Sequence, residues 1–130
     1  MQGSCLCGAV SYEVDEIISI KFCHCRTCQL AQGAPYIAAG GVKREHFRWL
    51  TGESLVTRYE SSPGKHRCFC SRCGTPLLAD RANLPHIALR VVTLKEDPKL
   101  RPTEHIWLND DCPWTLDSPD LPRHPAWPTV

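Results

Sequence analysis

The sequence has no excess of charge of either sign. Its 15 lysines and arginines are balanced by 14 acidic residues, which leaves a formal net charge of +1. Nucleic acids and anionic membranes are bound through clustered positive charge, and this composition offers none in excess. We therefore expect neither a nucleic-acid partner nor a membrane partner. A small-molecule partner fits the composition better.

Long apolar runs are also missing. No stretch approaches the ~20 apolar residues that span a bilayer. The opening MQGSCLCGAV has no basic segment followed by an apolar one, so no secretory signal is visible. We therefore expect a cytoplasmic protein. A length of 130 residues suits a single domain over residues 1–130.

Segments that favour a helix are scarce. Only residues 26–32, RTCQLAQ, have a suitable composition, with Gly33 as the end, and residues 43–47 suit one turn. Most other segments alternate apolar and polar residues or are rich in β-branched and aromatic ones. Strands are expected at 9–14, 18–23, 35–40, 55–61, 66–70, 75–79, 86–92 and 104–108. A turn at Gly40-Gly41 should end the third of them. The sequence thus predicts an all-β fold of small sheets.

Proline is distributed unevenly. Seven of the 11 prolines occur from Pro98 onward, and proline offers no amide donor for strand pairing. The last 33 residues should therefore be irregular. We expect this segment to wrap around the domain, anchored by Trp107, Trp114 and Trp127.

Cysteine, by contrast, is abundant. The nine cysteines are an odd number, and in a reducing compartment lasting disulfides are rare. Metal ligation by zinc explains them better than either free buried thiols or a disulfide framework, which are the alternatives. Eight of the nine fall into three groups: Cys5 and Cys7; Cys23, Cys25 and Cys28; and Cys68, Cys70 and Cys73. Cys112 stands alone.

Two of the groups contain matching half-sites. Side chains two apart on an extended segment share one face, so Cys5 and Cys7 can face the same ion. Cys70 and Cys73 have the CxxC spacing of a zinc knuckle. Each pair is followed by a glycine, which permits the positive φ of a tight turn. The four cysteines predict a closed, structural zinc site that joins the N-terminal strand to the middle of the chain.

The remaining group, Cys23, Cys25 and Cys28, follows a CxCxxC pattern. Three protein ligands leave the fourth position of zinc open to water or substrate, as in catalytic sites. The sequence therefore predicts a second, catalytic zinc here, for two zinc ions per chain.

Three nearby residues bear on whether that second site is open. His24 lies between two ligands and should point to the opposite face, as a packing residue. Cys68 could crowd the first site, and Cys112 could fold back onto the second. Either cysteine would close the second site if it became a fourth ligand.

Five segments together resemble the glutathione-dependent formaldehyde-activating enzyme family, which includes centromere protein V-like proteins. They are GSCLCGAVSYEV at 3–14, CHCRTC at 23–28, RYESSPGKHRCFCSRCGTPL at 58–77, HIW at 105–107 and PWTLDSPDLPR at 113–123. The resemblance implies a β-tent fold of small sheets. It also implies a structural zinc on Cys5, Cys7, Cys70 and Cys73 and a catalytic zinc on Cys23, Cys25 and Cys28.

The activity that the resemblance implies is that of a carbon–sulfur lyase. Read in the forward direction, the enzyme adds a thiol such as glutathione to formaldehyde or a related small aldehyde. Because three thiolates blunt the Lewis acidity of zinc, binding of the substrate thiolate is the favoured role of the metal. The alternative is a non-catalytic module, stabilised by zinc, that binds a protein or senses thiols or metal.

Basic residues near the second CxxC pair could receive the carboxylates of glutathione. The candidates are Lys65, His66, Arg67 and Arg72. A solvated strand face explains the same residues without any ligand. Tyr59, His105 and Trp107 are candidates for the pocket wall, although Trp107 also suits the core.

Overall fold

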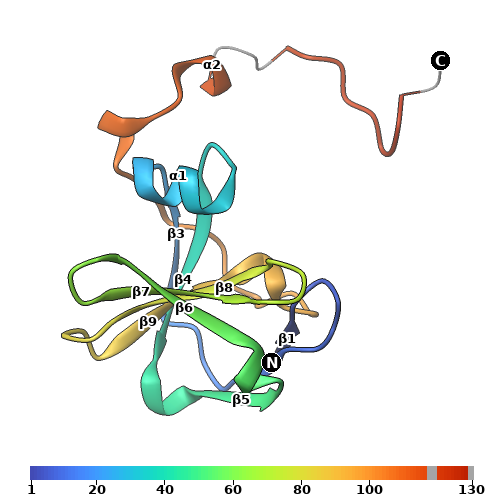
Figure 1. Ribbon diagram of the computed structural model, residues 1–130. Coiled ribbons are helices and arrows are strands. Elements are labelled where there is room, and N and C mark those ends of the chain that lie inside the picture. The colour runs from blue at the N-terminus through green and yellow to red at the C-terminus, as the bar shows by residue number, and fades with distance from the viewer. Residues whose placement is uncertain (117–119, 129–130) are drawn as a thin grey trace.

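The computed structural model describes residues 1–116 and 120–128, and strands dominate it (Figure 1). The strands are β1 Gln2–Ser4, β2 Ser11–Val14, β3 Ser19–Cys23, β4 Ile37–Lys43, β5 Phe47–Thr51, β6 Val56–Ser62, β7 Lys65–Cys70, β8 Pro76–Arg81, β9 His86–Arg90 and β10 Glu104–Ile106. The helices are α1 Arg26–Gln32 and α2 Pro113–Leu116. Short 3₁₀ turns occur at Arg44–His46, Glu53–Leu55, Val91–Thr93 and Leu108–Asp110.

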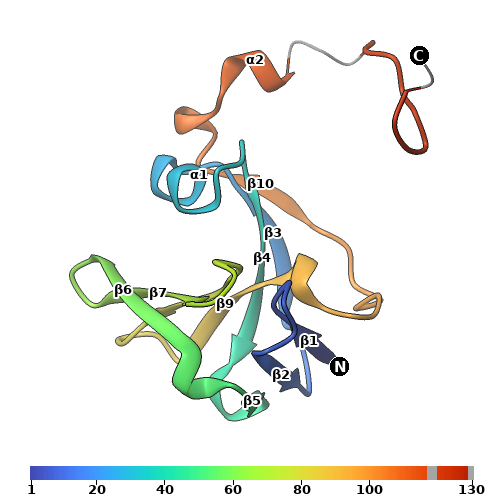
Figure 2. The ribbon, with the colours of Figure 1, turned by 45° about the vertical axis from the view of Figure 1, so that its right-hand side comes forward.

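The strands form two sheets. The smaller has the order β1-β2-β5, and the larger has the order β10-β3-β4-β9-β8-β7-β6. All neighbours pair antiparallel except β10, which pairs parallel to β3. In Figure 1 β3 and β4 run upright while β6, β7 and β8 cross the molecule, so the large sheet is strongly bent. Figure 2 shows α1 above β6 and β7, over one side of this bend.

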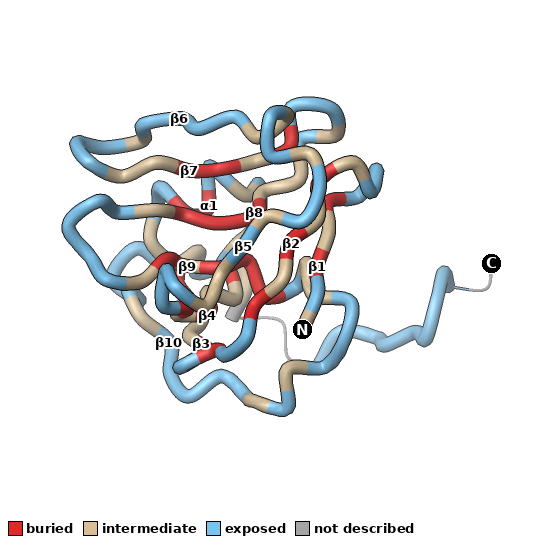
Figure 3. The backbone as a smooth tube through the Cα atoms, turned by 90° about the horizontal axis from the view of Figure 1, so that it is seen from below, coloured by how far each residue is buried: buried red, intermediate tan, exposed pale blue. Residues whose placement is uncertain are grey.

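The main core lies between the two sheets. It includes Val10, Tyr12 and Val14 of the N-terminal region together with Leu77 and Leu89 of the large sheet, all fully buried. The buried stretches of β2, β7, β8 and β9 gather at the centre in Figure 3, and exposed loops surround them. A second, smaller cluster contains Cys23, Cys28 and Ile37 beneath α1.

Helix α1 has the bounds that the sequence predicts. Its N-cap is Cys25, whose sulfur accepts a hydrogen bond from the backbone N–H of Cys28 at 3.4 Å. Its C-cap is Gly33, in the left-handed conformation with φ 61° that favours glycine. The cap therefore places two cysteine sulfurs at the first turn of the helix.

Sequence reasoning predicts most strands to within a few residues, and the mainly β fold of small sheets is confirmed. The expected turn at Gly40-Gly41 is wrong, because both glycines lie within β4. A Cβ on Gly40 would lie 3.1 Å from Val91, so glycine there serves close packing. No helix in the described part of the chain is long and apolar enough to cross a membrane.

The C-terminal segment is irregular, as expected, but its tryptophans are not anchors. The exposed fractions of Trp107, Trp114 and Trp127 are 63%, 68% and 92%. Backbone pairing of β10 with β3 attaches the segment instead, and polar contacts at Asp110 and Asp111 hold the part that follows. Figures 1 and 2 show residues 120–128 lying away from the sheets. The stretches 117–119 and 129–130 of the expected segment lie outside the described residues.

Candidate metal centres and the adjoining cavity

Four thiols from two distant segments converge beside the small sheet. The sulfur atoms of Cys5, Cys7, Cys70 and Cys73, here called the four-thiol cluster, all lie within 4.8 Å of one another. The sulfurs of Cys5 and Cys7 are 3.6 Å apart, and those of Cys7 and Cys70 are 4.0 Å apart. Gly8 and Gly74, one after each pair, both have φ 77°, so each pair ends in the tight turn that the sequence predicts.

Polar groups beside Cys5 and Cys73 favour their thiolates, whereas the neighbouring Cys5 sulfur raises the pKa of Cys7 to about 11. The backbone N–H of Val10 donates to the Cys5 sulfur at 3.3 Å. The Thr75 hydroxyl lies 3.2 Å from the Cys73 sulfur. That hydroxyl and backbone N–H groups lower the pKa of Cys73 to about 5. Since metals bind the deprotonated thiol, this environment is suited to a soft divalent cation.

Three thiols converge at the start of α1. The sulfurs of Cys23, Cys25 and Cys28, here called the three-thiol cluster, also lie within 4.8 Å of one another. Cys23 is the last residue of β3, Cys25 is the helix cap and Cys28 lies in the first turn. A strand end followed directly by a helix thus brings the CxCxxC spacing to a single point.

A buried arginine contacts this cluster. Arg67 of β7 has an exposed fraction of 7% and donates from Nη1 to the Cys28 sulfur at 3.7 Å. Its other contacts are the hydroxyls of Ser61 at 3.0 Å and Thr27 at 3.1 Å. Hydrogen bonds from Cys23, then from Cys25 and Arg67, lower the pKa of Cys28 to about 4. Arg67 is thus committed to the cysteines and is not a free surface cation.

His24 is a packing residue, as the sequence indicates. It is 1% exposed; its Nδ1 lies 2.8 Å from an oxygen of Asp111 and its Nε2 lies 2.8 Å from Nδ1 of His105. Its ring stacks on Tyr36 at 4.9 Å between centroids. Both nitrogens are therefore engaged by the protein, and His24 has no lone pair left for a metal.

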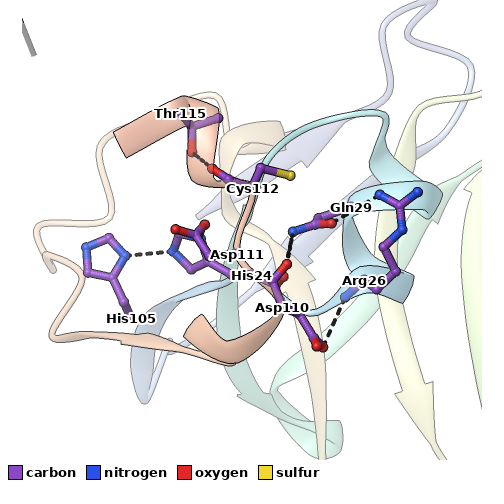
Figure 4. Close-up of polar contacts among 8 residues, drawn as sticks. All are labelled: His24, Arg26, Gln29, His105, Asp110, Asp111, Cys112 and Thr115. Carbon is purple, nitrogen blue, oxygen red and sulfur yellow. Dashed lines mark hydrogen bonds and ion pairs between the residues drawn. The ribbon is translucent and has the colours of Figure 1, made fainter. Parts of the chain in front are cut away.

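A neighbouring contact fastens the C-terminal segment to α1. The side-chain amide of Gln29 donates to the backbone carbonyls of His24 and Asp110, at 2.8 and 2.9 Å. Figure 4 shows Gln29, His24 and the Asp110–Asp111 turn side by side. The polar contacts thus brace the loop that carries Cys23 and Cys25.

A cavity of about 410 Å³, here called the triad cavity, opens beside the three-thiol cluster and is lined by all three cysteines. Its wall carries four cationic side chains and a single acid, Asp110. The cationic residues are Arg26, Lys65, Arg81 and Arg90. None of the four forms an ion pair with a carboxylate within the described residues. The cavity is therefore suited to a small anionic ligand.

Neither spare cysteine joins a cluster in the part of the chain that the structure describes. Cys68 is buried in β7, and its sulfur accepts a hydrogen bond from Arg58 at 3.4 Å. Cys112 precedes α2, where its carbonyl accepts from the Thr115 hydroxyl at 2.7 Å (Figure 4). The three-thiol cluster accordingly has three cysteine ligands to offer and a cavity on its open side.

The basic candidates named from the sequence divide. Lys65 lines the triad cavity. His66 instead pairs with Glu60 at 3.3 Å. Arg72 is exposed and lines neither large cavity. Sequence reasoning missed Arg81 and Arg90. The cross-strand pairing of Lys65 with Arg81 follows from the hairpin register, which only the structure fixes. A charged residue ending the apolar run HIAL was the available signal for Arg90.

The aromatic candidates divide as well. Trp107 lines the triad cavity and Tyr59 a neighbouring one, while His105 contacts His24.

Comparison with known proteins decides the family. The sequence model of the glutathione-dependent formaldehyde-activating enzyme family matches residues 1–110. The chain belongs to this family. The matched region contains both cysteine clusters and the triad cavity, and it ends just before Asp111, the partner of His24.

A solved structure supports the family fold. A crystal structure of a Rhodobacter sphaeroides protein is similar at a TM-score of 0.66 and 25% sequence identity, covering 81% of this chain and 99% of the other. None of the curated proteins matches the sequence. Within the family, the geometry of this chain therefore has to indicate its own substrate.

Proposed function

We propose that this protein is a zinc-dependent enzyme of the carbon–sulfur lyase type. In the forward direction it adds a small thiol, glutathione above all, to formaldehyde or a related small aldehyde. The observation that carries the proposal is a set of three cysteines on the wall of a cationic cavity. Family membership supports the same activity.

The donor sets fit the metal. Zinc prefers thiolates in tetrahedral surroundings, closed with four ligands in structural sites and open with three in catalytic ones. We assign a structural zinc to Cys5, Cys7, Cys70 and Cys73. A catalytic zinc is assigned to the site formed by Cys23, Cys25 and Cys28. When bound there, zinc supplies a position that holds an incoming thiol as its thiolate.

The chain's own residues supply the charge balance. Three cysteine thiolates would leave a divalent ion with net negative charge, which repels an anionic thiol. Arg67, which lies 3.7 Å from the Cys28 sulfur, offsets this charge. Arg90 is buried and lines the triad cavity. Both guanidiniums lie in a low-dielectric setting, where their effect is large. They make the open side of the cluster receptive to a thiolate.

Glutathione carries two carboxylates, and the cavity wall offers suitable partners. Lys65 and Arg81 are directly paired across β7 and β8, and Arg26 lies in the first turn of α1. Charge-assisted hydrogen bonds from these groups would orient the tripeptide with its sulfur toward the cysteines. Burial and the nearby Arg67 charge lower the pKa of Lys65, so a bound carboxylate would also relieve its desolvation.

The proposal is tested by comparing two thiols. We expect the protein with two zinc ions to accelerate formation of the hydroxymethyl thioether from formaldehyde with either glutathione or 2-mercaptoethanol. In the double variant Lys65→Ala/Arg81→Ala the KM for glutathione should rise about tenfold. The KM for 2-mercaptoethanol, which has no carboxylate, should not change.

The matched control is Lys95→Ala, which removes an exposed lysine that lines neither cavity. Rates are measured by NMR exchange between free aldehyde and adduct. No acceleration by protein shown to carry two zinc ions would overturn the proposed activity. An equal rise in KM for both thiols would overturn the assigned carboxylate contacts.

A further inference from the structure

A second cavity lies on the same side of the large sheet as the triad cavity. It has a volume of about 510 Å³, the larger of the two. Side chains alternate along a strand, so Lys65 and Arg67 share one face of β7, and a register shift follows between Cys68 and Phe69. Lys65 lines the triad cavity and Phe69 the second cavity, with Arg67 between them in sequence. The two cavities therefore lie one after the other along this face.

Side chains that lie between the two cavities also contact the three-thiol cluster. Thr27 and Arg90 line both cavities. Arg67 lines the second cavity and touches the Cys28 sulfur. Its Nη2 donates to the Thr27 hydroxyl at 3.1 Å, and that hydroxyl lies 3.5 Å from the Cys25 sulfur. The two cavities thus meet beside the three-thiol cluster, where a ligand can extend from one into the other past Thr27 and Arg90.

The chemistry of the second cavity is mostly apolar. Apolar parts of its wall come from Leu30, Ala31, Phe69, Pro76 and Leu78. Three of its polar groups, Thr27, Arg67 and Arg90, lie on the side of the cysteines, and Gln32, Tyr59 and Ser61 add polar atoms elsewhere on the wall. This arrangement suits a molecule with a hydrocarbon body and an oxygen at one end.

Arg90 is the donor available to that oxygen. It is 3% exposed and makes no ion pair within residues 1–116 and 120–128. Its Nε donates to Gln32 at 3.2 Å and its Nη1 to the Ala88 carbonyl at 3.1 Å. A guanidinium has five N–H groups, so the Nη2 pair has no acceptor in the described chain. Because Arg90 lines both cavities, these N–H groups are open to a ligand oxygen placed there.

We propose that the second cavity binds the hydrocarbon substituent of a larger aldehyde, so that the substrate class includes medium-chain alkyl and aryl aldehydes. Formaldehyde has no substituent and would leave this cavity unused. The inference rests on the proposed thiol-adding function and identifies its second substrate.

The reaction balances without a further reagent. The thiolate sulfur attacks the carbonyl carbon, forming the carbon–sulfur bond as the carbonyl π pair moves to oxygen. The oxygen then takes a proton from water, giving the hydroxyalkyl thioether, and the proton that the thiol released on forming its thiolate neutralises the hydroxide left behind. The free N–H groups of Arg90 donate to that oxygen while its negative charge develops. The hydrocarbon tail occupies the second cavity throughout.

Binding of stable product mimics tests the subsite without turnover. S-hexylglutathione and S-methylglutathione differ only in the length of the alkyl chain. Each buried methylene contributes ~0.8 kcal/mol, about fourfold in affinity. We expect S-hexylglutathione to bind the zinc-loaded protein at least about tenfold more tightly, measured by titration calorimetry. Equal affinities would overturn the inference.

A variant that fills the cavity locates the effect. Ala31 is exposed on α1 and lines the second cavity but not the triad cavity. Ala31→Trp should abolish the advantage of the hexyl over the methyl compound. It should also lower the ratio of kcat/KM for hexanal to that for formaldehyde about tenfold or more. The matched control Ala82→Trp, at an exposed alanine that lines neither cavity, should leave both ratios as in the parent protein.

The outcomes separate this inference from the proposed function. Turnover of formaldehyde but not hexanal would overturn the inference and leave thiol addition standing. The same would follow if Ala31→Trp and Ala82→Trp behaved alike. Turnover of no aldehyde at all would overturn the proposed function itself.

Discussion

The two cysteine clusters use the same half-motifs in different ways. In the four-thiol cluster a CxC pair and a CxxC pair come from segments more than sixty residues apart, and the chain turns back after each pair. In the three-thiol cluster the CxC and CxxC patterns share Cys25, which leaves one ligand fewer. No glycine follows at once; the chain continues into α1 instead. Sharing a single cysteine thus turns a closed set of ligands into an open one.

The two cysteine clusters also differ in whether they adjoin a cavity. None of the four clustered cysteines near the small sheet lines either large cavity, whereas all three of the others line the triad cavity. Cys5 and Cys70 belong to the main core, together with Tyr12 and Leu77. One cluster therefore joins distant parts of the fold, and the other faces a place where a ligand can enter. Stability and activity should depend on different cysteines.

The largest effect is expected from Cys7→Ser. Cys7 is exposed, so little packing is lost, but its sulfur lies 3.6 Å from Cys5 and 4.0 Å from Cys70. Binding energies of ~10 kcal/mol at structural zinc sites are folding energy, and domains of this size are stable by only about 5–15 kcal/mol. We expect the variant to be largely unfolded, as measured by circular dichroism. A folded variant with an unchanged melting temperature would contradict the structural role.

A smaller loss of stability but a complete loss of activity is expected at Cys25. Its sulfur is both a proposed ligand and the N-cap of α1. Serine keeps a capping oxygen, whereas alanine removes it at a cost of ~1 kcal/mol. Both variants should lose one of two zinc ions, measured by mass spectrometry, and all turnover. Both variants lose the stability that the zinc ion contributes, and Cys25→Ala should be less stable than Cys25→Ser by a further ~1 kcal/mol in urea unfolding. Activity retained with a single zinc would break the comparison.

The sequence predicts the local features of the two clusters but not the contacts between distant elements. Cysteine spacing groups the seven clustered thiols because CxC and CxxC geometry is local, and Gly8 and Gly74 mark the turns. Contacts between elements were not predictable. Arg67 reaches Cys28 across 39 residues, and Lys65 meets Arg81 only through the register of β7 and β8.

The failure at the C-terminus has a related cause. Tryptophan predicts burial by its apolar area, yet three are exposed here. Short polar contacts at Gln29 and His24 hold the segment instead, and no periodic pattern announces them. Strand patterns and the family resemblance both predicted small sheets, but neither gave the strand order, which depends on pairing between segments distant in sequence. Whether residues 1–130 form one zinc-binding domain stays a prediction.

A third prediction sharpens the role assigned to Arg67. Outer partners of metal ligands commonly change metal affinity or activity 10–100-fold. Arg67→Met keeps an unbranched stem but removes the guanidinium and its charge at Cys28. We expect zinc affinity at the three-thiol cluster to change less than about tenfold, while the KM for glutathione rises about 10–100-fold. Arg67→Lys, which keeps a positive charge, should raise the KM for glutathione less than Arg67→Met does.

The readout that separates charge from packing is spectroscopic. With cobalt in place of zinc, the absorption change on adding glutathione reports a new sulfur ligand. In Arg67→Met the absorption change should require a higher glutathione concentration than in the parent protein. The control variant Arg58→Met removes the charge beside Cys68 instead, and it should show the absorption change at the same concentration as the parent protein. If the two variants behaved alike, the effect would be one of core packing and not of charge at the cluster.

The smallest effect separates the core from the metal clusters by pH. Burial raises the pKa of Tyr12 to about 12, although its hydroxyl bonds Thr93 at 2.6 Å. Between about pH 10 and 12 the unfolded chain loses this proton and the folded chain keeps it, so stability present below pH 10 falls as the pH rises. The wild type should lose up to about 2 kcal/mol over this range. Tyr12→Phe has no proton to lose, so its stability should fall less steeply.

The difference between the two proteins is the quantity to measure, by urea unfolding at intervals from pH 8 to pH 11. Alkali leaves cysteine ligands deprotonated, so both proteins should keep two zinc ions, whereas acid protonates the thiols of both clusters alike. At pH 7 the variant should lose only about 1 kcal/mol, for the hydrogen bond to Thr93. Parallel pH profiles would mean that the phenol ionises freely in the folded state. Any alkaline loss of stability would then come from other titrating groups and not from Tyr12 in the core between the sheets.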